Sequence, residues 1–163
     1  MSLIALHKVL ADHGLAMSNL GSISDQSIAG IVTTCTHGTG FNFGVIPTHV
    51  LALDVLLPPK SAYSAGSPDA TVVRCSSTEH PDLFNASLCG LGASGFITAV
   101  TLKVEKAFRL REVRRVIGFD EAVRDLDSLM TSSEHSKIWW FPSTGKVKFF
   151  GADRTYEVRI TLS

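Results

Sequence analysis

The residues best suited to chemistry lie in one segment, residues 19–44 (NLGSISDQSIAGIVTTCTHGTGFNFG). Five glycines stand among short hydroxyl residues, and the only ionisable side chains are those of Asp25, Cys35 and His37. Glycine lets a ligand approach the backbone closely, and Ser and Thr offer short donors and acceptors. The composition therefore favours a ligand that lies against the backbone.

A short helix is expected inside this segment, over residues 27–34. Asp25 or Ser27 would cap it, because both side chains can accept a hydrogen bond from a free amide of the first turn. The first amides of the helix would then face an anion such as a pyrophosphate.

The two best-known phosphate-binding loops are excluded, since the chain has neither a GxGxxG turn after a strand nor a GK[ST] loop. An ordinary surface loop is the alternative to a binding loop for residues 19–44. For His37 the alternative to a functional role is a side chain satisfied by nearby backbone groups.

Other chemistry-bearing residues are weaker candidates. Trp139 and Trp140 could stack on a sugar, but neighbours in a strand point to opposite faces, so core packing is favoured. Glu79, His80 and Asp82 read as a solvated turn, and no metal site is predicted. No G-x-S-x-G elbow supports nucleophilic catalysis.

Composition narrows the class of protein. The 163 residues are enough for a real core, and 15 basic residues balance 15 acidic ones, which gives no electrostatic footprint for nucleic acid or an anionic membrane. Three widely spaced cysteines indicate reduced thiols in an intracellular protein. No signal peptide is recognised, and the longest apolar run, residues 50–57, is too short to span a bilayer.

The elements that must position these residues alternate irregularly, which predicts an α+β fold rather than a doubly wound parallel sheet. A loop is expected over residues 58–70, and a domain boundary between Ala107 and Arg111. Hydrophobic periodicity and turn residues predict helices over 3–13, 27–34, 81–89 and 119–131, and strands over 50–57, 71–75, 96–105, 111–117, 137–142 and 146–150.

Three stretches carry a resemblance to a known family. The run SNLGSISDQSIAGIVTTCTHGTG (residues 18–40) resembles the signature of the aldonolactone oxidases, flavoenzymes of the vanillyl-alcohol-oxidase superfamily. LCGLGASGFITAVTLKV (88–104) is similar to a second family stretch. LMTSSEHSKIWWFPSTGKVKFF (129–150) resembles the pattern of fungal arabinonolactone oxidases.

The resemblance implies a domain organisation. Residues 1–107 would be the second subdomain of a PCMH-type FAD-binding domain, and residues 111–163 the start of an α+β cap domain. The family's N-terminal FAD subdomain, with its G-H-S histidine, and the rest of the cap are expected to be missing from this chain.

Matching the motifs position by position implies which residues contact FAD. The backbone around Phe96 and Ile97 is one part of this set. The remaining implied contacts all lie in the first motif, and they are Ser22, Ser27, Gly30, Thr34, Cys35, Thr36, His37 and Gly38.

Gly21 matches a position that resembles a gate for oxygen in this superfamily. A glycine there fits oxidases, because an added methyl group at van der Waals contact would block a diatomic path to reduced flavin. The alternative is that Gly21 only satisfies a turn.

The implied function of the complete protein is FAD-dependent oxidation of an aldono-1,4-lactone, of the arabinonolactone type. Oxygen would accept the electrons, giving hydrogen peroxide and an ascorbate-like product. The partners would be a sugar lactone and oxygen, and the resemblance implies mitochondrial membrane association through the missing parts. The alternatives are a gulonolactone or alditol oxidase, or a catalytically incompetent fragment that binds FAD weakly or not at all.

Overall fold

The computed structural model describes residues 1–58 and 70–157, which form two compact units. The first unit comprises Met1–Gly38 and Gly44–Glu105. The second comprises Thr39–Phe43 together with the chain from Lys106 onward. Most of the loop expected over residues 58–70 lies outside the described residues.

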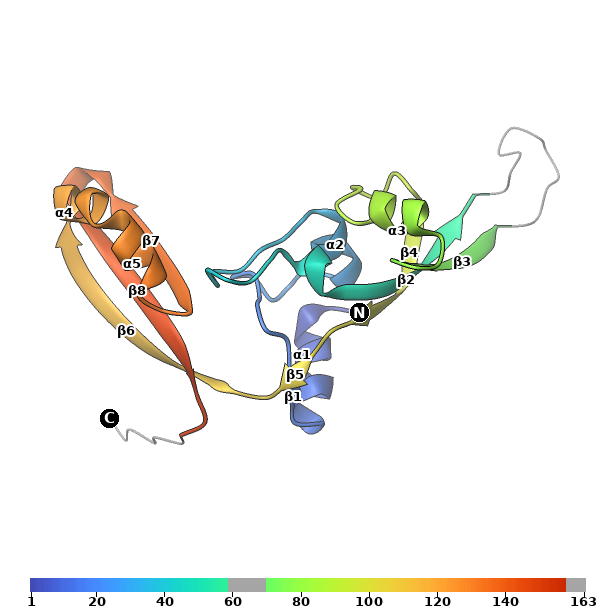
Figure 1. Cartoon of the computed structure of the whole chain (residues 1–163), viewed down its shortest axis with the longest axis horizontal. Helices are drawn as coiled ribbons and strands as arrows, with labels where there is room; N and C mark the ends of the chain where they lie inside the picture. The colour runs from blue at the N-terminus through green and yellow to red at the C-terminus, as the bar shows by residue number, and fades with distance from the viewer. Residues whose placement is uncertain (59–69, 158–163) are drawn as a thin grey trace. The chain divides into compact units, whose positions relative to one another are not determined.

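Helices and strands mix along the chain, which confirms the α+β class (Figure 1). The helices are α1 (Leu3–Asp12), α2 (Ile28–Thr33), α3 (Pro81–Ser87), α4 (Phe119–Arg124) and α5 (Leu126–Thr131), with 3-10 turns η1 (Ile46–His49) and η2 (Pro142–Thr144). The strands are β1 (Leu15–Ala16), β2 (Val50–Leu57), β3 (Thr71–Ser76), β4 (Phe96–Leu102), β5 (Glu105–Lys106), β6 (Arg109–Gly118), β7 (His135–Phe141) and β8 (Lys146–Thr155).

The first unit is built on an antiparallel sheet of order β3-β2-β4. The central strand β2 is the buried strand that its continuous Val/Leu run predicts, with Leu53 and Val55 fully buried. Helix α1 contributes Leu3 to the same core, and α2 contributes Ile31 and Val32. The core therefore fixes α2 and β4 on the same body.

The second unit is an antiparallel sheet of order β6-β8-β7, with α4 and α5 lying along it (Figure 1). Its core joins Ala122 and Leu129 from the helices to Val147 and Phe149 from β8. The strands expected over 137–142 and 146–150 are confirmed as β7 and β8, which pair antiparallel: η2 turns the chain between them, and Gly145 adopts a left-handed φ of 62°.

The single helix expected over residues 119–131 is wrong, because the chain breaks at Asp125. Asp125 leaves helical geometry (φ −105°, ψ 17°) and ends α4 as α5 begins. Its carboxylate pairs with the neighbouring Arg124. Val123 and Leu126 remain exposed as a result, so the apolar face is only partly buried.

The preference for burying Trp139 and Trp140 in the core is also wrong. Their exposed fractions are 49% and 55%. Trp139 meets Phe150 edge-on at 4.6 Å between ring centroids, and Trp140 stacks on Phe119 at 4.8 Å. Trp139 thus contacts a ring of β8 and Trp140 a ring of α4, while about half of each indole stays exposed.

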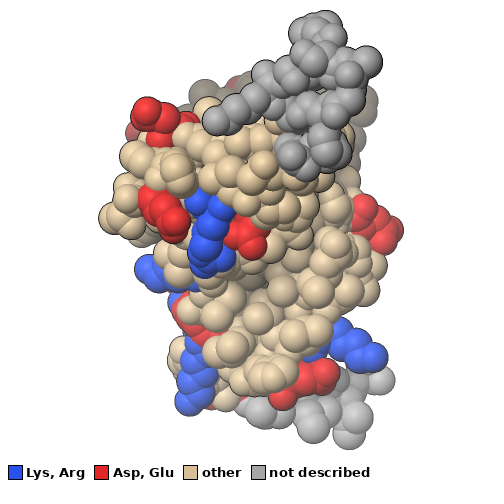
Figure 2. Space-filling model, turned by 90° about the vertical axis from the view of Figure 1, so that its right-hand side faces the viewer, with Lys and Arg blue, Asp and Glu red and all other residues tan. Residues whose placement is uncertain are grey.

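Charge is scattered over the surface. Figure 2 shows basic and acidic side chains intermixed on a face made mostly of other residue types, in keeping with 15 residues of each sign. Within residues 1–58 and 70–157, no helix has both the length and the apolar character needed to cross a membrane.

Candidate functional site

Asn19 anchors the segment in which the binding residues are predicted. This buried side chain accepts a hydrogen bond from the Leu20 amide at 3.2 Å and donates one to the Gly44 carbonyl at 3.5 Å. The two ends of residues 19–44 are thereby joined. A Cβ at Gly38 would lie 1.8 Å from Asn19 Oδ1 and 2.5 Å from the Leu20 carbonyl oxygen. Gly38 is required by this close packing.

Gly21 sits in less crowded surroundings. A Cβ there would lie 3.0 Å from Thr36 Cγ2 and 3.6 Å from the His37 carbonyl oxygen. Gly21 therefore adjoins two of the predicted flavin contacts, and an alanine would fit after a small shift of one methyl group.

Ser27 caps α2, as one of the two predicted candidates. Its hydroxyl accepts a hydrogen bond from the Gly30 amide at 3.0 Å, while Asp25 has no part in the cap. The expectation that the first amides of α2 face an anion stays a prediction, with fewer amides available to an anion than a bare helix start offers. The Ile28 amide donates to the Met1 carbonyl at 3.1 Å, and the Ile31 amide donates to the Ser27 carbonyl at 3.0 Å. Protein acceptors thus satisfy most of the amides that a phosphate would need.

The far end of α2 positions the next three predicted contacts. Thr34 ends the helix, and its hydroxyl donates to the Gly30 carbonyl at 2.8 Å and lies 3.2 Å from the Thr36 hydroxyl. Cys35 then takes a left-handed φ of 57°, which turns the chain away from the helix. The Thr36 carbonyl accepts a hydrogen bond from the Ile46 amide at 2.8 Å.

His37 is exposed, and its Nδ1 lies 2.9 Å from the carbonyl oxygen of Gly38. One ring nitrogen is thus occupied locally, as the backbone-satisfied alternative predicts. The exposed ring still borders the turn at Gly21 through its backbone carbonyl. Both interpretations of this residue remain compatible with its position.

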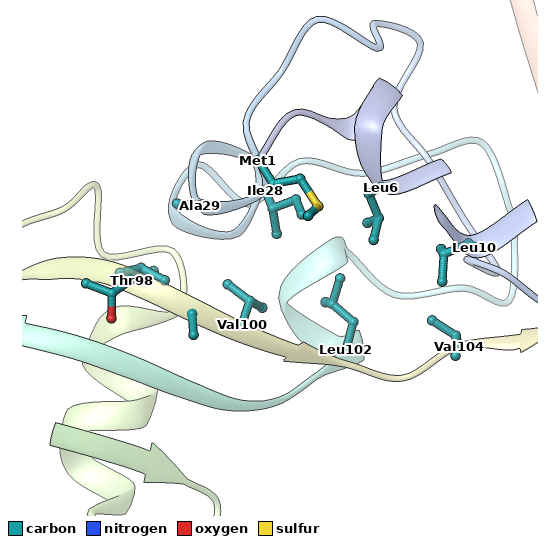
Figure 3. Close-up of a pocket in the computed structure, with 11 residues that line it drawn as sticks. Met1, Leu6, Leu10, Ile28, Ala29, Thr98, Val100, Leu102 and Val104 are labelled. Atoms are coloured by element: carbon teal, nitrogen blue, oxygen red, sulfur yellow. The ribbon is translucent and has the colours of Figure 1, made fainter. Parts of the chain in front are cut away.

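An apolar groove runs between β4 and the two helices α1 and α2 (Figure 3). It has a volume of about 480 Å³, within the range of small-ligand sites. In Figure 3 the side chains of Met1, Ile28 and Leu6 point toward Val100 and Leu102 across the groove. Ala29 and Ile97 complete the lining beside the cap of α2.

The predicted site residues are only partly brought together. Ile97 lines the groove, and the capping pair Ser27–Gly30 flanks its residues Ile28 and Ala29. The Phe96 side chain does not line the groove and is 78% exposed, so the predicted contact through its backbone stays a prediction. Gathered instead around Gly21 and the end of α2 are the remaining contacts: Ser22, Thr34, Cys35, Thr36, His37 and Gly38.

Two structural residues of this site were missed by the sequence reasoning. Asn19 is not predicted as a site residue, although its two hydrogen bonds hold the segment closed. Ala29 is not predicted either, because a lone alanine carries no chemistry, yet it lines the helical side of the groove beside Ile28. The contact between Asn19 and Gly38 spans 19 positions, and no local pattern encodes it.

Similarity to known proteins covers most of the chain. A family model described as D-arabinono-1,4-lactone oxidase matches residues 100–162. The D-arabinono-1,4-lactone oxidase of Yarrowia lipolytica is 39% identical over 137 residues, covering 84% of this chain and 24% of that protein. The L-gulonolactone oxidase of Mus musculus is 35% identical over 150 residues, covering 92% of this chain and 32% of that protein.

A solved structure supports the fold independently. A mutant of the cholesterol oxidase from Brevibacterium sterolicum superposes with a TM-score of 0.80 at 19% identity, covering 94% of this chain and 30% of that one. At this identity the likeness concerns the fold. The chain spans between about a quarter and a third of the length of these curated relatives.

Proposed function

Because this chain belongs to the aldonolactone oxidase family over the part of the relatives that it spans, we propose that it contributes to the FAD site of an oxidase acting on an aldono-1,4-lactone. The likeness to cholesterol oxidases confirms the expected α+β fold of a PCMH-type FAD-binding domain. D-Arabinono-1,4-lactone is the substrate we propose, since the matching family model and the fungal relative are both described as D-arabinono-1,4-lactone oxidases.

The residues present fit a flavin nucleotide in two respects. The groove offers apolar walls to a ring system, with Ile97 and Val100 on one side and Ile28 and Ala29 on the other. Beside it, residues 19–38 offer exposed hydroxyl side chains and small residues that leave the backbone accessible. When bound, FAD would supply the hydride-accepting chemistry, and the chain would bind and orient it.

The observation that carries the proposal is the closed segment of residues 19–44. Asn19 holds its ends together, and Gly38 admits no side chain, so this surface is fixed before any ligand arrives. A fixed surface loses little conformational entropy on binding, which favours a large cofactor. Since the Ile28 and Gly30 amides at the start of α2 already donate to the Met1 carbonyl and the Ser27 hydroxyl, we propose the hydroxyl contacts at Ser22, Thr34 and Thr36 instead.

In the complete protein we propose that residues 1–107 form the second FAD subdomain and residues 111–163 the start of the cap. Oxygen would take the electrons and yield hydrogen peroxide with an ascorbate-like lactone. Gly21 supports oxygen use, because a methyl group added there would lie 3.0 Å from Thr36 Cγ2 and 3.6 Å from both Gln26 Oε1 and the His37 carbonyl oxygen, and would fill the space between them. A mitochondrial, membrane-associated location belongs to the same proposal, through parts outside this chain.

A gulonolactone oxidase is the second candidate, favoured by the 35% identity with the mouse enzyme. An alditol oxidase, and a fragment that binds FAD weakly or not at all, are the remaining alternatives. Comparing D-arabinono-1,4-lactone with L-gulono-1,4-lactone as substrates of the full-length protein would separate the first two.

The direct test is an FAD titration of the purified chain, followed by flavin fluorescence and the visible spectrum. We expect a shifted flavin band and saturable binding that Ala29→Arg weakens at least tenfold, since the long side chain would fill the groove. Ala11→Arg on the exposed side of α1 is the matched control and should bind FAD as the unchanged chain does. Equal FAD binding by both variants would rule out the groove as the flavin site. A protein that stays colourless after FAD is added would favour the alternative of a fragment that does not bind FAD.

A further inference from the structure

Two of the three cysteines meet at the end of α2. The backbone amides of Cys35 and Cys89 donate to the same acceptor, the Val32 carbonyl oxygen, at 3.5 and 3.2 Å. Two chain segments that share one carbonyl oxygen bring their side chains within reach of each other. Disulfides need Cα atoms only about 4.4–6.8 Å apart.

A second hydrogen bond fixes how residues 89–91 align with the end of α2. The Leu91 amide donates to the Thr33 carbonyl at 3.1 Å, so residues 89–91 close the carboxyl end of α2 at two successive carbonyls. Gly90 makes the approach possible, because a Cβ there would lie 2.1 Å from the Ala86 carbonyl oxygen. The turn cannot shift without losing this packing.

The thiols themselves interact and remain accessible. Burial, and then a hydrogen bond with Cys35, raise the pKa of the Cys89 thiol. Cys89 is exposed and Cys35 half-buried, whereas Cys75 is fully buried within β3. A small oxidant can therefore reach the pair but not the third cysteine.

We propose that Cys35 and Cys89 form a reversible disulfide that records exposure of this protein to peroxide. In the first step one thiolate, that of Cys35, attacks hydrogen peroxide, giving a sulfenic acid and hydroxide. The Cys89 sulfur then displaces the sulfenic oxygen as water. Overall two thiols and one peroxide give one disulfide and two waters. A low-molecular-weight thiol reverses the reaction by exchange.

The oxidation state of the Cys35–Cys89 pair would affect the proposed flavin contacts beside it. Cys35 stands between Thr34 and Thr36, two of the proposed flavin contacts, so the crosslink would fix the turn that carries them. This consequence rests on the proposed function, in which hydrogen peroxide is the product of the same protein. The crosslink itself depends only on the geometry at α2.

The crosslink is tested by treating the reduced full chain with hydrogen peroxide, alkylating the remaining thiols under denaturing conditions and mapping peptides by mass spectrometry. We expect the loss of two thiols per chain, one peptide pair joined through Cys35 and Cys89, and full recovery with dithiothreitol. Cys75→Ala should behave in the same way. Cys89→Ser should give no crosslink and should drive Cys35 on to irreversible acids.

Three retained thiols under a dose that oxidises free cysteine in the same tube would overturn the proposal, as would crosslinks through Cys75 or between chains. FAD titration of both states separates this inference from the proposed function. Peroxide should weaken FAD binding several-fold in the unchanged chain and dithiothreitol should restore it, whereas dithiothreitol should not reverse the effect of peroxide on Cys89→Ser. A chain that forms the crosslink but binds no FAD in either state would support the disulfide proposal and contradict the proposed flavin site.

Discussion

Gly21 and Gly38 belong to the same segment, yet the space around them differs greatly. Gly38→Ala places a methyl group 1.8 Å from Asn19 Oδ1 and 2.5 Å from a backbone oxygen, so the segment must move. We expect it to lower the free energy of unfolding by about 1–3 kcal/mol, as other overpacked sites do. Gly21→Ala has one tight contact, a side-chain methyl group at 3.0 Å, with its other neighbours at 3.6 Å, and should cost less than about 1 kcal/mol.

Urea unfolding of both variants measures this difference. The comparison also sharpens the oxygen-gate hypothesis, because Gly21→Ala can then be assayed in the full-length protein as a folded variant. A lower rate of reoxidation by oxygen, with unchanged reduction by lactone, is the result expected for a gate. Equal destabilisation by the two substitutions would contradict the packing described around Asn19.

His135 is buried, and its surroundings in the folded protein disfavour the protonated imidazole. Its burial lowers the pKa of the imidazole, and Arg154 adds to this, while Glu134 and Asp153 act in the opposite direction. Unfolded histidine titrates near about 6.5, so below that pH the unfolded chain binds the proton more readily. The contribution to stability is complete above the unfolded pKa and is lost as the pH falls through the folded pKa.

Denaturant unfolding between pH 7.5 and pH 5 measures this loss. His135→Gln should flatten the pH dependence over that interval, because it removes the titrating group. His13→Gln, on the exposed end of α1, is the control and should leave the slope unchanged. A slope that survives in His135→Gln would assign the effect to other groups.

At the scale of elements, α2 shows how a six-residue helix is stabilised from outside itself. Ser27 satisfies its third amide, and the segment of residues 89–91 satisfies carbonyls at its other end. Ser27→Ala should therefore lower the free energy of unfolding by about 1 kcal/mol, the usual cost of losing an N-cap hydroxyl. Thermal and urea unfolding provide the measurement.

Ser22→Ala is the matched control for the cap. Ser22 is exposed and belongs to the same segment, so its stability effect should stay within about 0.5 kcal/mol. If Ser22 contacts flavin as proposed, the same substitution weakens FAD binding while leaving unfolding unchanged. A loss of stability comparable to that of Ser27→Ala would mean that Ser22 has a structural role.

Elements were predictable where local chemistry decides them. The buried run of β2, the turn at Gly145 and the cap at Ser27 each follow from residue type and spacing. The break at Asp125 was not predictable, because an unbroken apolar stripe runs through it and only packing on the sheet selects the break. The meeting of Cys35 with Cys89 was equally hidden, since it depends on how residues 89–91 close α2.

At the scale of the whole molecule, the second unit recruits five residues from far upstream. The Phe41 amide donates to the Glu134 carbonyl at 3.0 Å, and the Ser136 amide donates to the Thr39 carbonyl at 2.9 Å. Residues Thr39–Phe43 thus pair antiparallel with the beginning of β7. Residues 39–43 therefore belong to the second unit, whereas residues 19–38 and 44 belong to the first, a division that sequence separation alone does not predict.

Phe43 is the side chain through which this recruitment can be tested. Its ring stacks on His135 at 5.3 Å between centroids, and the Arg154 guanidinium lies 5.0 Å from its centre. Phe43→Ala removes both contacts and should destabilise the second unit by about 1–3 kcal/mol, less than a fully buried phenylalanine would. Phe41→Ala is the control in the same segment, because that ring is 57% exposed.

Hydrogen exchange followed by mass spectrometry distinguishes the two units in this experiment. Phe43→Ala should speed exchange in β7 and β8 while β2 keeps its protection, because local openings occur in separate cooperative units. Phe41→Ala should change neither. Faster exchange in β2 as well would show that the two units unfold together, and a substitution in the binding segment would then act on the whole chain rather than on the second unit alone.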